Sequence, residues 1–285
     1  MIYIFGPKTI SKTWELPFYL YANCISRVLN NNNIKNRIIN KNNLKDVKED
    51  DLMIVFQPYM RDELLNKIIF INSESLSIRK EILKELKNPN IKMIWDYQNK
   101  NIELLNGRSL YVPFTYHEFL EEHFIREKVE KDIDFLFYGK LNKRRSQILD
   151  RLKQKYNMVH LETTDYKTLY NHINRSKIVL YICFYENSKE FDFYRLTPLL
   201  SNKIFFLTED IEKEDKEIKE IFENKMMFIK YENFYDECVR NINLKEEDRI
   251  KKTDELYKIF KNKLKLDKFI PIEKIKELDN SSTDI

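Results

Sequence analysis

Short apolar runs of strand length alternate along this chain with longer stretches in which apolar and charged residues recur at helical spacing. The runs of the first part are IYIF, LMIVFQ, KIIFIN, IKMIWD and LYVPF, and those of the second part are DIDFLFY, NMVHL, KIVLYICFY, KIFFLT and KMMFIK. Strands rich in Ile, Val and Phe that alternate with helices are typical of βαβ units, in which a parallel sheet is covered on both faces. The pattern therefore predicts an α/β fold.

The charged stretch HEFLEEHFIREKVEKD separates the two series of strands, which places a domain boundary near residue 130. We predict a Rossmann-like domain over residues 1–130, a second one over residues 131–245, and C-terminal helices with a polar tail over residues 246–285. A chain of 285 residues is long enough for two domains, although short for two full Rossmann domains.

Charge and cysteine content narrow the class of protein. The 50 basic and 46 acidic residues leave a net charge of +4 and are mixed along the chain, which argues against generic nucleic-acid binding. Cys24, Cys183 and Cys238 lie far apart among apolar residues, so we expect reduced core thiols. No signal peptide is visible, and no apolar run approaches the ~18 residues that span a bilayer. We expect a cytoplasmic protein without a membrane span, and the oligomeric state stays open.

Two of the three glycines occupy equivalent places in the two halves, because Gly6 and Gly139 each follow the first strand of their half. At that turn the backbone either bends tightly or approaches a ligand, and both interpretations stay open. After Gly139 the chain continues with basic residues into a helix. A helix N-terminus beside cations binds anions, so we predict a diphosphate site at Gly139, Lys140, Asn142 and Arg144. The alternative is a solvated basic helix start.

The segment EFDFYRLTPLLSNKIFFLTED, residues 190–210, reads as a loop, a helix, a strand and an exit loop. Because proline is tolerated in a first turn, we predict that the helix starts only at about Arg195 to Pro198. Ligands of open α/β sheets bind at the C-terminal ends of strands, where the preceding strand KIVLYICFY would place Tyr185 and this segment would place Glu190, Asp192, Glu209 and Asp210. Arg195 either faces that crevice or forms a structural pair with Glu190 or Asp192.

Polar residues also follow strands of the first half. Glu74 and Asp96 are candidate general bases for an acceptor hydroxyl, with Asn72 beside them. Asp96 is alternatively the N-cap of the helix NKNIELL. The loop after the first strand carries Lys8 and Trp14, and Trp14 is either a platform for a sugar ring or a core residue.

The histidines are not spaced as a metal set, so no metal site is predicted. They are His117, His123, His160 and His172.

The segments FYGKLNKRRSQIL and RSKIVLYICFYENSKEFDFYRLTPLLSNKIFFLTE, with IIFINSES, IWDYQNKNIELL and YVPF upstream, together resemble a glycosyltransferase family of GT-B fold. Members of that family occur in bacteria and giant DNA viruses, and the resemblance covers most of residues 68–210. It implies two facing Rossmann-like domains with an interdomain cleft. The C-terminal domain would hold a nucleotide-sugar donor, and the N-terminal domain would hold the acceptor.

Many retaining GT-B enzymes carry two glutamates eight positions apart. Aligning KIFFL places Glu190 on the first and Pro198 on the second, so the first acid is kept and the second is lost. The loss leaves the stereochemistry open, and also the ribose contact, for which Glu209 or Asp192 is a replacement. The resemblance further implies that Lys140, Arg144 and Arg195, in descending order of exposure to the cleft, stabilise the leaving nucleoside diphosphate in place of a tightly bound metal.

We therefore expect a metal-independent glycosyltransferase with no tightly bound cofactor, a UDP- or GDP-sugar as donor and a glycan or glycoprotein as acceptor, working in the host cytoplasm if the chain is viral. The alternatives are a non-catalytic nucleotide- or sugar-binding module and a scaffold with an incidental crevice. The expected catalytic residues are Glu74, Asp96 and Glu190; the donor-binding residues are Gly139, Lys140, Asn142, Arg144, Tyr185, Arg195 and Glu209; the acceptor-side residues are Gly6, Lys8, Trp14 and Asn72.

Overall fold

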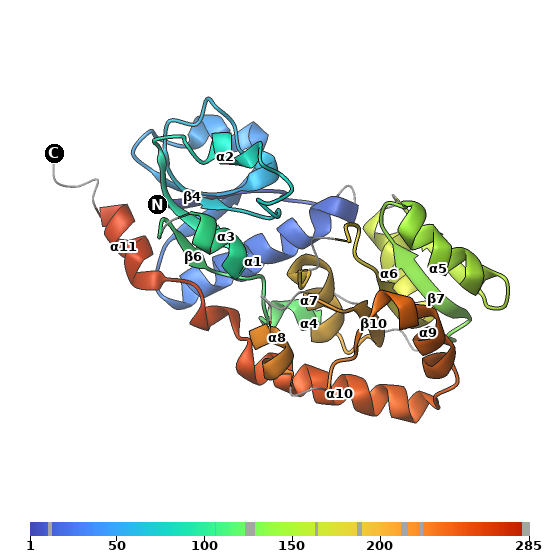
Figure 1. The fold of residues 1–285 in the computed structure, drawn as a ribbon. Coiled ribbons are helices and arrows are strands. Elements are labelled where there is room, and N and C mark those ends of the chain that lie inside the picture. The colour runs from blue at the N-terminus through green and yellow to red at the C-terminus, as the bar shows by residue number, and fades with distance from the viewer. Residues whose placement is uncertain are drawn as a thin grey trace. The chain divides into compact units, whose positions relative to one another are not determined.

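The computed structural model describes residues 1–10, 13–105, 107–122, 129–162, 165–186, 190–211, 216–222 and 225–280. These residues form two compact units, each with its own sheet and helices (Figure 1). The first unit contains residues 1–10, the described residues of 15–117, and residues 265–280, and the second contains residues 13–14 and the described residues of 118–264. The charged stretch at which we expected the boundary lies partly outside the described residues.

The first unit contains a six-stranded parallel sheet in the order β2-β1-β3-β4-β5-β6. Its strands are β1 (Ile2–Phe5), β2 (Asn36–Ile39), β3 (Leu52–Phe56), β4 (Lys67–Ile71), β5 (Ile91–Asp96) and β6 (Ser109–Tyr111). Its α-helices are α1 (Leu16–Asn31), α2 (Ile82–Glu85), α3 (Asn99–Leu104) and α11 (Ile272–Asn280). Strand β3 is buried along its whole length, as expected for a central strand of a sheet covered on both faces.

The second unit contains a five-stranded parallel sheet in the order β11-β10-β9-β7-β8. Its strands are β7 (Ile133–Tyr138), β8 (Met158–Leu161), β9 (Ser176–Tyr181), β10 (Phe206–Glu209) and β11 (Phe228–Ile229). Its α-helices are α4 (Phe119–Glu122), α5 (Lys143–Lys153), α6 (Tyr166–Arg175), α7 (Phe193–Ser201), α8 (Lys216–Ile221), α9 (Phe234–Ile242) and α10 (Glu246–Lys263). Short 3-10 helices are η1 (Thr13–Glu15), η2 (Lys41–Asp46), η3 (Gln57–Tyr59), η5 (Tyr231–Asn233) and η6 (Leu266–Lys268).

The predicted α/β class with two Rossmann-like units is confirmed. Each predicted apolar run overlaps a strand, and the sheets are parallel. The pattern missed β2, whose sequence NRII has only two apolar residues and is mostly half-buried or exposed. The three cysteines are buried free thiols, as expected.

Each sheet has one place where the chain reverses its direction of winding. Strand β1 lies between β2 and β3, and β7 lies between β8 and β9. Gly6 and Gly139 follow these two strands, and each extends the parallel ladder by one bond, from Gly6 N to Ile39 O (3.1 Å) and from Gly139 N to Leu161 O (2.8 Å). Ligands of open α/β sheets bind beside such a switch point, at the carboxyl ends of the strands.

Helix α7 begins at Phe193, so the prediction that it starts only at about Arg195 to Pro198 is wrong. The cause is Asp192, whose side chain accepts a hydrogen bond from the Arg195 backbone N–H at 3.1 Å and so caps the first turn. Pro198 therefore lies inside the helix and is buried. Its missing N–H removes one bond of the helix.

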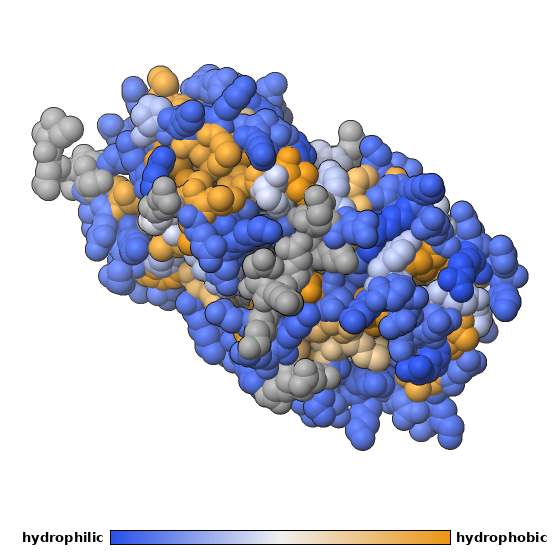
Figure 2. Space-filling view, in the orientation of Figure 1, coloured by the Kyte–Doolittle hydropathy of each residue, from blue (hydrophilic) through white to orange (hydrophobic). Residues whose placement is uncertain are grey.

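Figure 2 shows that hydrophilic residues cover most of the visible face of the protein. Among the described residues, no helix combines the length and the apolar character that crossing a membrane requires.

Candidate functional site

The turn after β7 lies at the switch point of the second unit, and side chains hold its three consecutive carbonyls at residues 138–140. Arg195 Nη1 donates to the first carbonyl at 3.1 Å, and Arg145 Nη1 donates to the third at 2.7 Å. His160 Nε2 lies 2.9 Å from the carbonyl oxygen of the second. Three elements, α7, α5 and β8, thus supply donors that hold these carbonyl oxygens.

Helix α5 begins directly after this turn, with Asn142 as its N-cap. The Asn142 Oδ1 accepts from the Arg145 backbone N–H at 2.9 Å, and its Nδ2 donates to the Phe184 carbonyl at 2.6 Å. In the part of the chain that the structure describes, the backbone N–H groups of residues 140, 141, 143 and 144 have no acceptor. Unpaired N–H groups at a helix N-terminus are the usual protein contribution to a phosphate site.

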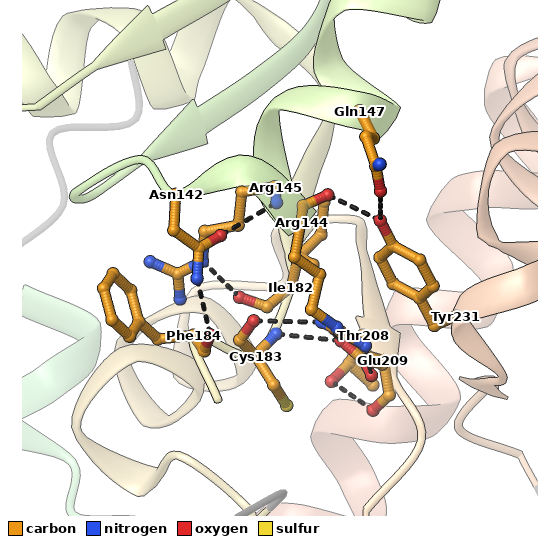
Figure 3. Close-up of polar contacts among 10 residues, drawn as sticks. All are labelled: Asn142, Arg144, Arg145, Gln147, Ile182, Cys183, Phe184, Thr208, Glu209 and Tyr231. Carbon is orange, nitrogen blue, oxygen red and sulfur yellow. Dashed lines mark hydrogen bonds and ion pairs between the residues drawn. The ribbon is translucent and has the colours of Figure 1, made fainter. Parts of the chain in front are cut away.

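Arg144 does not point to solvent as a lone cation, because it forms a two-bond ion pair with Glu209 at the end of β10 (Figure 3). The Arg144 Nη1 to Glu209 Oε2 distance is 2.6 Å, and Nη1 also donates to the Cys183 carbonyl at 3.0 Å. The Cys183 backbone N–H donates to the same carboxylate at 3.0 Å. Tyr231 covers the guanidinium, whose carbon lies 3.8 Å from the ring centroid. The pair therefore joins α5, the end of β9 and β10.

Arg145 is buried, and among the described residues no carboxylate pairs with it. Its Nε donates to the Ile182 carbonyl at 2.9 Å, and its guanidinium lies over the rings of Phe137 and Phe184 at 5.1 and 5.0 Å. Burial, with the nearby Arg195 charge adding to it, lowers the pKa of Arg145 to about 10. The guanidinium stays charged at neutral pH and makes the switch point electropositive.

Arg195 is more exposed than Arg144, with 31% of its side chain accessible against 14%. Arg195 Nε lies 3.5 Å from Asp192 Oδ2, which is the structural pairing that the sequence left open. Its guanidinium also lies over Gly139, since a Cβ built there would be 2.9 Å from both Nη1 and Nη2. Gly139 has a φ of +127°, a conformation that favours glycine.

The other predicted donor residues are exposed or half-buried. Lys140 is exposed, and Glu190 is half-buried two positions before the Asp192 cap. Tyr185 is 44% exposed and packs edge-on against Phe184.

In the first unit the structure brings Asn72 and Asp96 together, at the ends of β4 and β5. Both are fully buried, and Asn72 Nδ2 donates to Asp96 Oδ2 at 2.8 Å. Asp96 Oδ1 accepts from the Gln98 N–H and from Asn101 Nδ2, each at 3.0 Å. Burial raises the pKa of Asp96 to about 6, against these hydrogen bonds, which lower it. Gln98, not Asp96, occupies the N-cap position of α3. Asp96 thus ties together the two loops that follow β4 and β5.

Glu74 has a more open environment than Asp96, with 41% of its side chain accessible and Arg79 Nη1 at 3.8 Å from its Oε1. Lys8 is exposed and donates to Asn43 Oδ1 at 2.7 Å. Trp14 is 48% exposed, which excludes the reading of a core residue. Gly6 packs against Phe56, whose ring would lie 3.2 Å from an added Cβ.

Two residues of the second-unit site, His160 and Arg145, were not among the predicted donor-binding residues, although Arg145 belongs to the basic run after Gly139. Arg145 lies three positions after the Asn142 cap, so capping spacing offered a signal for its backbone but none for its inward side chain. His160 lies in a strand and belongs to no sequence motif.

No group of three or more His, Cys, Asp or Glu side chains in the described ranges is arranged to hold a metal ion.

No protein-family model matches the chain. A curated relative, an uncharacterized protein of Acanthamoeba polyphaga mimivirus, is 27% identical over 179 residues, which are 60% of this chain. The match spans 61% of that relative's length. Among solved structures, the α,α-trehalose 6-phosphate synthase of Burkholderia multivorans matches with a TM-score of 0.52 at 10% identity. The match covers 95% of this chain and 78% of the chain of that enzyme.

A UDP-forming α,α-trehalose-phosphate synthase from Burkholderia vietnamiensis matches with a TM-score of 0.49 at 10% identity, over 96% of this chain and 80% of its own. At such identity, the likeness to the Burkholderia multivorans enzyme shows the fold alone. It supports the resemblance at the level of a GT-B fold with two Rossmann-like units.

Proposed function

We propose that this protein is a glycosyltransferase that moves a sugar from a nucleoside diphosphate-sugar to a hydroxyl group. The observation that carries the proposal is the turn after β7. Its carbonyls are held by Arg195, His160 and Arg145, while the N–H groups of residues 140, 141, 143 and 144 have no acceptor in the described chain. Such a turn at a switch point is suited to an anion with several oxygens, such as a diphosphate.

In this proposal Arg195 and Lys140 contact the diphosphate, since both are accessible and Arg144 is already paired with Glu209. A nucleoside diphosphate gains negative charge as it leaves, and fixed guanidinium and N–H donors stabilise that charge without reorganising. Glu190 is proposed to contact the sugar. The fold is shared with a synthase of trehalose 6-phosphate, which agrees with a sugar-transferring role.

The acceptor is proposed to bind the first unit at the carboxyl end of β4, with Glu74 as the general base. A general base must be able to reach the proton that it removes, and Glu74 is accessible whereas Asp96 is fully buried. Glycans and glycoproteins carry suitable hydroxyl groups, and we keep them as the acceptor class.

Isothermal titration of the full chain with UDP, GDP and their common sugars tests the donor site. The proposal expects binding to at least one nucleotide, weakened in Arg195→Ala by about 1.5–3 kcal/mol, the contribution of one hydrogen bond to a charged group. The matched control is Arg240→Ala, because Arg240 belongs to the same unit and pairs with Glu237 on the exposed surface of α9. A folded protein that binds none of these nucleotides rules the proposal out.

A second candidate function is a non-catalytic nucleotide- or sugar-binding module. It is favoured by Pro198, which stands where the resemblance expects a second glutamate, and by Glu209, whose carboxylate is occupied by Arg144. The two candidates separate on turnover. If UDP or GDP binds but no nucleotide is released from any donor sugar across a screen of acceptors, the module is the correct description.

A further inference from the structure

His160 lies in β8, beside β7, and its ring is fixed by the fold. The parallel register pairs it with Phe137, and the two rings stack with 5.8 Å between centroids and 29° between planes. The ring nitrogen Nε2 lies 2.9 Å from the Gly139 carbonyl oxygen. Because a carbonyl can only accept, Nε2 must carry the proton in this contact.

Fixing this carbonyl also fixes the next N–H group. A trans peptide is planar, with its C=O and N–H directed to opposite sides, and the structure contains no cis peptide bond among its described residues. The hydrogen bond from His160 to the Gly139 oxygen therefore aims the Lys140 N–H away from β8. The φ of +127° at Gly139 lets the chain take this orientation directly after the strand.

The carbonyls before and after Gly139 are held by Arg195 and Arg145, both of which are cations in the same electropositive region. His160 differs from them because it adds no fixed positive charge when neutral and because it reaches the turn from a strand, β8, and not from a helix. The effect of the His160 hydrogen bond on ligand binding can therefore be measured separately from the electrostatic attraction of an anion.

We propose that His160 is a positioning residue of the diphosphate site, which acts through the Gly139 carbonyl to aim the Lys140 N–H at a phosphate oxygen. This inference rests on the proposed function, because it assigns the anion to the same turn. His160 itself does not touch the ligand.

Three variants separate this role from general packing. His160→Gln keeps a donor nitrogen near the Nε2 position, whereas His160→Leu keeps much of the volume without a donor. His160→Asn, whose amide is too short to reach the carbonyl, serves in its place if the leucine variant does not fold. The matched control is His172→Leu, since His172 Nδ1 also contacts a backbone carbonyl, that of Thr168 at 2.7 Å, but within α6.

Two measurements are made on each folded variant. The first is the carbonyl ¹³C signal of Gly139 in protein labelled at glycine C′, which is resolvable because the chain has only three glycines. The second is the affinity for UDP, GDP and inorganic diphosphate by calorimetry. We expect His160→Leu to shift the Gly139 signal and to weaken binding by roughly tenfold, the effect of about one hydrogen bond. His160→Gln should restore both, and His172→Leu should change neither.

Equal affinity in the wild type and in His160→Leu would overturn the inference and leave the proposed function standing. A Gly139 signal unmoved by His160→Leu would overturn it as well, since the contact would then be absent in solution. A wild-type chain that binds none of the three ligands would instead overturn the proposed function, and the inference with it.

Discussion

We expect the ion pair between Arg144 and Glu209 to hold α5 and β10 together, so that its loss lowers the local stability of the second unit. Replacing Arg144 by methionine keeps the long apolar stem and removes the guanidinium. Glu209, which is 0% exposed, then retains only the Cys183 N–H among the donors described above. Removing the guanidinium partner of a buried carboxylate is costly, because burial removes the water that would otherwise solvate the charge.

The size of the effect follows from the contacts that are lost. Arg144 makes two hydrogen bonds to the carboxylate, and hydrogen bonds to charged groups contribute about 1.5–3 kcal/mol each. Removing one partner of a buried pair costs about 3–5 kcal/mol, and the partial exposure of Arg144 favours the lower end. We therefore expect Arg144→Met to lower the local stability by about 3 kcal/mol. Arg144→Met with Glu209→Leu should cost less than Arg144→Met alone, because the buried charge that loses its guanidinium partner is removed as well.

Hydrogen exchange followed by mass spectrometry measures this effect in the peptides that contain Cys183 and Glu209. A loss of about 3 kcal/mol corresponds to roughly hundredfold faster exchange of the amides that open through this region. The matched control is Arg175→Met, which breaks a pair of similar geometry with Asp132 where both side chains are exposed. Exposed pairs contribute little, so its exchange should match the wild type. The reasoning is refuted if Arg144→Met exchanges no faster than this control, or if the double variant exchanges faster than Arg144→Met.

Three further predictions concern the two units separately. Gly139→Ala should weaken UDP or GDP binding by about 1–3 kcal/mol through backbone strain and displacement of Arg195, whereas Gly107→Ala, with open space around it, should not; calorimetry decides. Glu74→Gln should lower kcat by roughly 10²-fold or more with little change in KM for the donor, and an unchanged kcat would exclude it as the base. Asp96 has a folded pKa of about 6 against an ordinary 3.8, so the native state binds its proton more tightly. The stability of the wild type relative to Asp96→Asn should therefore fall by about 3 kcal/mol in total as the pH rises from well below 3.8 to well above 6, and a flat difference in urea denaturation would contradict this.

The strands could be predicted from the sequence because buried parallel strands consist of continuous apolar runs. Strand β2 could not, since NRII lies at the edge of its sheet and its pattern resembles a loop. The start of α7 was missed although Asp192 is a good capping residue three positions before Arg195. The prediction instead assumed that Pro198 must lie in the first turn of the helix, whereas it lies inside the helix.

The turn after β7 could be predicted from the sequence, but the contacts that its neighbouring side chains make could not. The position of Gly139 after the first strand of its half indicated the turn, because glycine adopts backbone conformations that other residues avoid. That Arg144 pairs with Glu209, 65 positions away, depends on which strands become neighbours. The same holds for His160, which meets Gly139 only through the register of β7 and β8. Local patterns carry no information on such contacts.

A crystal structure of the full chain with UDP or GDP bound tests the central claim most directly. The account predicts a diphosphate at the carboxyl end of β7, with its oxygens at about 2.7–3.2 Å from the Lys140 N–H and from the Arg195 guanidinium. A nucleotide whose diphosphate lies away from this turn, with both donors uninvolved, would contradict it.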